Sequence, residues 1–131
     1  MRLLALAALL AAPPATPAQV VRAWSTDLNA NRNEAAARLF APDARVVQPG
    51  VDVVLSSHAL AVAFNDALPC AGKITRLQVR GSQVTATFLL GARPQHRCDG
   101  PGQKAATLFV VRDGKILLWR QVPVPPASPS A

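Results

Sequence analysis

The chain has 131 residues, half of them hydrophobic, and a formal net charge of +7. This length fits one domain that can bury a sizeable core without a structural metal. The basic residues recur singly, with no basic run interleaved with aromatic residues, so the composition argues against nucleic-acid binding and favours a solvated basic surface.

Residues 1–18 have the pattern of a secretory signal peptide. A positive residue follows the initial methionine, residues 3–12 are all apolar, and a Pro-rich stretch of small residues ends at Ala18. The apolar run is about half the ~20 residues that cross a bilayer, so we expect a leader and no membrane span. Thr16 and Pro17 are well suited to start a helix, however, and cleavage after Ala18 would remove that start. We expect a periplasmic or secreted protein, or a cytoplasmic one if this segment is not a signal peptide.

Cys70 and Cys98 are the only cysteines. In an exported chain we expect them to form a disulfide, which the chain-entropy model values at about 3–4 kcal/mol. A cytosolic chain would keep them as free thiols. A nucleophilic cysteine is the least favoured alternative, because only His58 and His96 could serve as its base.

Three helices are predicted in the first half of the chain. Apolar residues at helical spacing indicate a first helix from residue 16 or 18 to about 29, and a short second helix covers 34–40. A serine at position 56 or 57 caps the third helix, which runs to Leu68. Its predicted buried face consists of Leu60, Ala61, Phe64 and Leu68.

Six strands are predicted around and after these helices. The first two cover 44–48 and 51–55, and in the second of them Val51, Val53 and Leu55 form the inward set. Two hairpins are predicted, one with its turn at Gly81-Ser82 and the other with its turn at Asp113-Gly114. These residue pairs are typical of type II′ and type I′ turns, respectively. Their four strands cover 74–80, 83–91, 104–112 and 115–122.

Alternation along the hairpin strands leaves apolar residues on both faces of the sheet. In the last strand Trp119 and Gln121 share one face, and Arg120 lies on the other among aliphatic residues. A sheet that is apolar on both sides either packs against a partner or encloses a cavity. We therefore expect a homodimer formed through the sheet.

The order of these elements, with the motifs Leu28-Asn-Ala, Leu39-Phe-Ala-Pro-Asp-Ala and Asp113-Gly-Lys-Ile, resembles the nuclear-transport-factor-2-like superfamily in its SnoaL-like branch. The resemblance covers about residues 17–123. It implies an α+β fold in which a cone-shaped, curved, mixed or antiparallel sheet wraps around three helices. We place this domain at 19–123 and expect the Pro/Ser/Ala-rich tail, 124–131, to be disordered.

That superfamily includes ketosteroid isomerases, polyketide cyclases, epoxide hydrolases, dehydratases and members that only bind, so the resemblance does not select an activity. The isomerases use a carboxylate before a proline at the end of the first strand, where this chain has Gln48. Their tyrosine on the first helix aligns with Trp24, and this chain contains no tyrosine. An amide cannot take a proton from carbon, so isomerase chemistry of that kind is not expected.

The other chemistries also lack their residues. The epoxide-hydrolase-like members hold water with two aspartates and an arginine. Of the aspartates in this chain, Asp52 has the least clear structural role, and it is predicted to point outward. SnoaL-like cyclases use a histidine or aspartate in the pocket. His58 is predicted on the first turn of the third helix and His96 in the loop beside Cys98. Neither these residues nor Asp99 has metal-ligand spacing, so no catalytic residue, metal or cofactor is predicted.

What remains is a pocket with apolar walls and a few indole, amide and guanidinium groups. We predict that it binds a small, mostly apolar molecule. An isomerase, cyclase or hydrolase of the same superfamily and a non-catalytic dimerisation or interaction module remain the alternatives. The expected pocket residues are Trp24, Gln48, Phe64, Asn65, Phe88, Trp119, Arg120 and Gln121, although Trp119 and Arg120 cannot both face inward on a regular strand.

Overall fold

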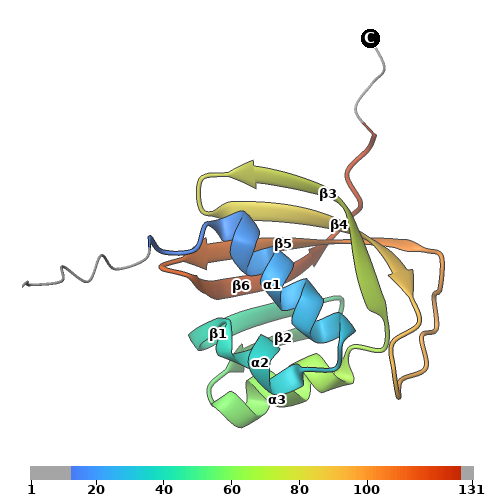
Figure 1. Cartoon of the computed structure of the whole chain (residues 1–131), viewed down its shortest axis with the longest axis horizontal. Helices are drawn as coiled ribbons and strands as arrows, with labels where there is room; N and C mark the ends of the chain where they lie inside the picture. Colours follow the sequence, from blue (N-terminus) through green and yellow to red (C-terminus); the bar gives the residue numbers. More distant parts are fainter. Residues whose placement is uncertain (1–12, 128–131) are drawn as a thin grey trace, which may run out of the picture.

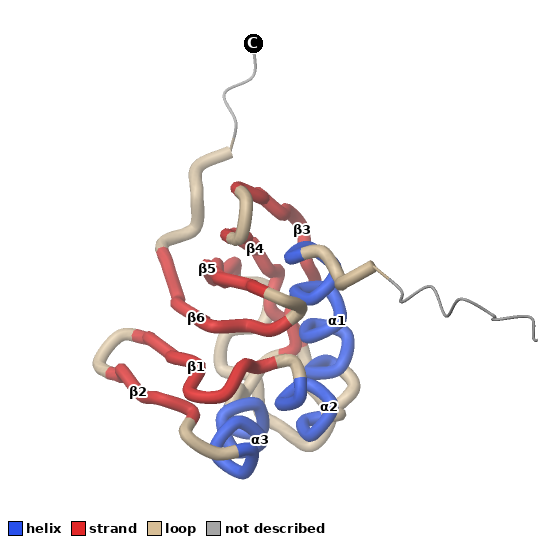
Figure 2. Tube along the Cα trace, turned by 90° about the vertical axis from the view of Figure 1, so that its left-hand side faces the viewer, coloured by secondary structure: helices blue, strands red, loops and turns tan. Residues whose placement is uncertain are grey.

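The computed structural model describes residues 13–127, and it has three helices packed on the concave face of a curved six-stranded sheet (Figures 1 and 2). This is the α+β cone predicted from the sequence. The elements in chain order are α1 (Pro17–Asn29), α2 (Asn33–Arg38), β1 (Phe40–Gln48), β2 (Val51–Leu55), α3 (His58–Ala67), β3 (Ala71–Arg80), β4 (Gln83–Gly91), β5 (Lys104–Arg112) and β6 (Lys115–Val122).

The sheet is mixed, with the strand order β2-β1-β6-β5-β4-β3. Every neighbouring pair is antiparallel except β1 and β6, which run parallel. Below, the inner face of the sheet is the one that carries the helices, and the outer face is the other. In Figure 2 the strands curve from β3 to β2 around the side on which α1, α2 and α3 lie.

Local sequence signals explain where several elements start and turn. Thr16 and Gln19 form a reciprocal capping box at the start of α1, with Pro17 as its first residue. At the β5–β6 turn both central residues have positive φ, 52° for Asp113 and 76° for Gly114, as a type I′ turn requires. At the β3–β4 turn Gly81 has a φ of 56°, in keeping with a II′ turn.

Two strand starts differ from the sequence prediction because non-local pairing decides them. β1 begins at Phe40 instead of 44, since Phe40 pairs with Ile116 of β6 and the Ile116 amide donates to the Leu39 carbonyl at 2.8 Å. The second helix accordingly ends at Arg38. β3 begins at Ala71 instead of 74, where it pairs with β4.

Two apolar faces that the sequence predicts to lie inward are only partly buried. Leu60 of α3 is 46% exposed, because this helix turns Ala61 and Asn65 into the protein instead. Val51 and Val53 of β2 are also exposed, at 42% and 44%, and only Leu55 of that strand is buried. β2 is one of the two edge strands, and its only buried residue, Leu55, is the one nearest in sequence to α3.

The core lies between α1 and the inner face. Trp24 of α1 meets Phe109 of β5 edge-on, with ring centroids 5.4 Å apart, and Phe64 of α3 meets Trp119 of β6 at 5.1 Å. Edge-to-face pairs of this kind add to the free energy of apolar burial. These rings fix the position of α1 and α3 over the sheet.

The predicted leader falls largely on residues 1–12, which lie outside the described residues. Within residues 13–127, no helix combines the length and apolar character needed to cross a membrane.

Candidate functional site

A cavity of about 220 Å³ lies between the second half of α1 and the inner face of the sheet. Its floor comes from β1, β4, β5 and β6, and one wall comes from the segment that joins α3 to β3. The lining residues are Trp24, Ser25, Leu28, Asn29, Gln48, Leu68, Pro69, Cys70, Gly72, Phe88, Leu90, Ala105, Thr107, Trp119 and Gln121.

Five of the eight residues predicted at a pocket line this cavity: Trp24, Gln48, Phe88, Trp119 and Gln121. They come from α1, β1, β4 and β6, so the fold brings together residues that are distant in sequence. Strand alternation was the signal that placed Trp119 and Gln121 on the same face.

Phe64 and Asn65 lie behind the lining instead of in it. Asn65 is fully buried; its Oδ1 accepts a hydrogen bond from Trp24 Nε1 at 2.9 Å, and its amide nitrogen donates to the Ala61 carbonyl at 3.0 Å. Phe64 packs against Trp119 and Phe40. Both residues hold a cavity wall in place.

Arg120 does not line the cavity. Its neighbours Trp119 and Gln121 do, so alternation directs Arg120 to the outer face. There its charge helps Arg45 to lower the pKa of Asp52, and the Arg45 hydrogen bond is the largest cause of that shift. Arg45 and Asp52 form an exposed bidentate ion pair, so Asp52 is engaged outside the cavity.

Two of the polar lining residues already have partners on β3. Asn29 donates to the Gly72 carbonyl at 2.8 Å and accepts from the Gly72 amide at 2.9 Å, and Ser25 donates to the same carbonyl at 3.3 Å. A side chain at position 72 would not fit, because its Cβ would lie 2.8 Å from the Phe88 ring. Gly72 therefore allows α1, β3 and Phe88 to meet at one corner of the cavity.

Four other polar groups on the lining have no hydrogen-bond partner among residues 13–127. Trp119 is 5% exposed and its buried Nε1 has no acceptor. The side chains of Gln48, Thr107 and Gln121 likewise form no hydrogen bond with the described protein. Of these groups only Trp119 Nε1 is a buried donor without an acceptor, which is costly; Gln48 is half-buried and Gln121 is exposed. All four groups have hydrogen-bonding capacity for a bound molecule or water.

No side chain on the lining can exchange a proton near neutral pH. All seven acidic residues lie in the described part of the chain, and none of them lines the cavity. His58 lies at the start of α3, 3.8 Å from Glu34, and His96 contacts Asp66. Cys70, which does line the cavity, is joined to Cys98 in a disulfide.

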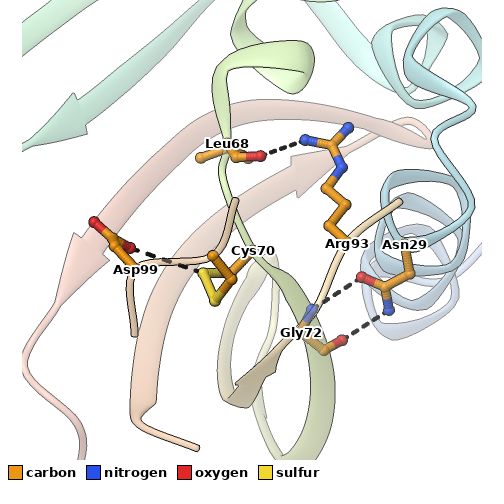
Figure 3. The surroundings of a disulfide bond; sticks show 7 residues. Asn29, Leu68, Cys70, Gly72, Arg93 and Asp99 are labelled. Carbon is orange, nitrogen blue, oxygen red and sulfur yellow. Dashed lines mark hydrogen bonds between the residues drawn. A yellow bond between two sulfur atoms is a disulfide. The ribbon is translucent and has the colours of Figure 1, made fainter. Parts of the chain in front are cut away.

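The disulfide belongs to a set of contacts that holds the β4–β5 loop, residues 92–103, beside the cavity (Figure 3). Arg93, only 2% exposed, donates to the Asn65 carbonyl at 2.7 Å, to the Leu68 carbonyl and to Asn33 Oδ1. Burial lowers the pKa of Arg93 and the charge of Asp66 opposes that shift. The guanidinium thus satisfies carbonyls at the end of α3 just before the Leu68–Cys70 wall begins.

Sequence reasoning missed Arg93, Thr107 and Gly72. Arg93 lies in an irregular loop, where no periodicity indicates which side chains are buried. Thr107 sits opposite Gln121 in the β5–β6 register, so cross-strand pairing at the second hairpin could have identified it.

A second hollow, of about 520 Å³, lies between α2, β1 and the start of α3. Its rim is basic, but the charged groups there have partners. Lys115 donates to the Arg38 carbonyl at 2.5 Å, and the Arg38 guanidinium pairs with Glu34 at 2.8 Å. No buried polar atom of this hollow lacks a partner. No group of three or more potential metal ligands occurs among the described residues.

No model of a known protein family matches the sequence, and no curated protein matches it. Solved structures are similar in fold. An NTF2-like protein of unknown function from Cytophaga hutchinsonii superposes with a TM-score of 0.70 at 12% identity, over 86% of this chain and 93% of that one.

Two further structures have TM-scores of 0.64. A putative polyketide cyclase from Sinorhizobium meliloti is 21% identical over 79% of this chain and 93% of its own. A protein from Catenulispora acidiphila with a ketosteroid-isomerase-like fold, in complex with trimethylamine, is 19% identical over 82% of this chain and 87% of its own. Identities this low establish the fold and leave the activity open. The chain has the nuclear-transport-factor-2-like fold that its sequence resembles.

Proposed function

We propose that this chain binds a small, mostly apolar molecule in the cavity between α1 and the inner face of the sheet. The observation that carries the proposal is the lining itself. Trp24, Leu28, Phe88, Leu90 and Trp119 give it apolar walls, and a few uncharged polar groups interrupt them. Binding pockets for small molecules have this composition.

The size of the cavity limits the ligand. An apolar cavity on the order of 150 Å³ in another protein holds benzene. At about 220 Å³, this cavity suits a molecule of one or two rings.

Proton-transfer chemistry of the isomerase or cyclase type is not supported by this lining. Such reactions need a base within hydrogen-bond reach of the proton it removes. The position nearest to that role is Gln48, which is neutral at every pH at which the protein folds. We therefore do not extend the cyclase and isomerase activities named for the structural neighbours to this chain, and we propose ligand binding as its function.

A pocket-filling variant tests the proposal. Ala105 lines the cavity opposite Phe88, so Ala105→Phe should occupy it, whereas Ala59→Phe on the exposed side of α3 adds the same ring elsewhere. Native mass spectrometry of unreduced protein from its own host should show a bound small molecule in the wild type and in Ala59→Phe. The same molecule retained by Ala105→Phe would place binding elsewhere and refute the proposal.

We also propose that two copies pair through the outer face of the sheet. Half-buried Leu108, Val110, Leu118 and Val122 surround Arg120 on β5 and β6 of that face, and the three helices of the described chain lie on the opposite face (Figure 2). Sedimentation velocity should give a dimer, and Leu118→Glu should give a monomer that keeps its fold. A wild-type monomer at high concentration would refute this pairing.

Export remains our proposal for the location of the protein. The intact capping box at Thr16 supports cleavage before that residue, because removal of Thr16 would leave α1 uncapped. N-terminal sequencing of the protein from its host tests both points. An uncleaved N-terminus would contradict export, and a mature chain that starts after Ala18 would contradict cleavage before Thr16.

A further inference from the structure

The unpartnered polar groups of the cavity form one row across the sheet. Thr107 of β5 pairs directly with Gln121 of β6. Val47 of β1 pairs with Arg120 of β6, and these two strands run parallel. The residues that follow them, Gln48 and Gln121, are therefore also side by side. Gln48, Gln121 and Thr107 are therefore neighbours on the inner face, and all three line the cavity.

Trp119 lies one step deeper along β6. It faces the same side as Gln121, and its Nε1 has no acceptor within the described residues. The other indole, that of Trp24, is already bonded to Asn65 and has no capacity to spare. The cavity therefore offers the row of three polar side chains at the end nearer the solvent and one indole donor deeper inside.

The row provides both donors and acceptors but no charge. Each glutamine amide can donate and accept, a threonine hydroxyl can do both, and an indole N–H only donates. Arg93, a buried cation, does not line the cavity, and its two terminal nitrogens donate to oxygens of Asn33, Asn65 and Leu68. An ionised ligand would leave its charge unpaired among apolar walls, which is strongly unfavourable.

We infer that the ligand class of this site is an uncharged ring compound that carries an amide or lactam group. Its carbonyl accepts hydrogen bonds from the Gln48–Gln121–Thr107 row and from Trp119, its N–H donates to a glutamine oxygen, and its ring packs on Trp24 and Phe88. This inference rests on the proposed function, since it presumes that the cavity is the binding site. Gln121 and Thr107, which pair across β5 and β6, are the residues that determine specificity.

Three probes of matched shape test the inference: naphthalene, 2-naphthamide and 2-naphthoate. The amide and the carboxylate are nearly isosteric, and the carboxylate is ionised at pH 7. In calorimetric titrations at that pH, 2-naphthamide should bind about tenfold or more tightly than naphthalene, and 2-naphthoate should bind at least tenfold more weakly than the amide.

Variants of the row test whether these side chains cause the preference for 2-naphthamide over naphthalene. Thr107→Val and Gln121→Leu should each weaken 2-naphthamide about five- to tenfold and leave naphthalene binding within twofold of the wild type. Gln78→Leu, on the exposed part of β3, makes the same change of side chain away from the cavity and should alter neither affinity. Retained naphthalene binding shows that each variant is folded.

The outcomes separate the two proposals. If naphthalene binds as tightly as the amide, or 2-naphthoate binds as tightly, the cavity is a binding site and the assigned ligand class is wrong. If the amide is preferred but the row variants do not change that preference, the row is not the determinant and the inference fails. If none of the three probes binds, the proposed function fails with it.

Discussion

Replacing Asn65 with leucine should destabilise the fold more than any conservative change at the surface. Asn65 is fully buried and links two helices, because its Oδ1 accepts from Trp24 Nε1 on α1 and its amide nitrogen donates to the Ala61 carbonyl within α3. Leucine has a similar volume, so the change removes hydrogen bonds without opening a large cavity. It also leaves the Trp24 N–H buried without an acceptor.

The magnitude follows from these contacts. Each net hydrogen bond contributes about 0.5–1.5 kcal/mol, and an orphaned buried donor costs about 1–3 kcal/mol. Some of this is offset by burial of the leucine side chain, so we expect a loss of about 2–4 kcal/mol in the free energy of unfolding. For a domain of this size the thermal midpoint should fall by about 10 °C.

Urea unfolding followed by tryptophan fluorescence measures this loss, with Gln78→Leu as a surface control that should stay within about 0.5 kcal/mol of the wild type. A cycle with Trp24→Phe isolates the bond itself. The Trp24→Phe change should cost at least about 1 kcal/mol less in the Asn65→Leu background than in the wild type. Additive effects, or an Asn65→Leu variant as stable as the wild type, would refute the assignment of Asn65 as the link between α1 and α3.

Three further predictions concern the cap, the bridge and the outer ion pair. Thr16→Ala removes the capping box of α1 and should lower the free energy of unfolding by about 1 kcal/mol, with no change in urea m-value; an unchanged midpoint would show that the cap does not contribute. Replacing both Cys70 and Cys98 with serine should cost about 3–4 kcal/mol, because the bridge closes a loop with a sequence separation of 28, and a loss below about 1 kcal/mol would contradict the chain-entropy estimate. The pKa of Asp52 is lowered chiefly by its hydrogen bond to Arg45, so the pair stabilises the fold at pH values above the ordinary carboxyl pKa and ceases to do so as the pH falls through the lowered value. Carbon-detected NMR titration should therefore show the pKa of Asp52 rise in Arg45→Met, and an unchanged value would rule out the pair in solution.

The parts of the fold that the sequence predicts are those decided locally. The turn at Asp113-Gly114 follows from two residues that tolerate positive φ, and the start of α1 follows from Thr16 and Pro17. Strand alternation likewise separates Trp119 and Gln121 from Arg120. In each case the deciding interactions are made within a few residues of the chain.

The parts that the sequence does not predict depend on contacts between distant segments. α3 buries Asn65 in preference to Leu60 because Trp24, on another helix, needs an acceptor there. An apolar pattern alone would assign the reverse. Arg93 is buried because the carbonyl groups at the end of α3 lie beside its loop, and nothing in the loop sequence records that arrangement.

The indole N–H signals of the two tryptophans test the central claim most directly, since both rings line the cavity and each gives one resonance. Addition of 2-naphthamide should move both signals with one shared saturation curve, and the Trp119 signal should move further because its N–H gains its first acceptor. Shifts confined to backbone amides around the second hollow, with both indole signals unmoved at saturation, would contradict a binding site between α1 and the sheet.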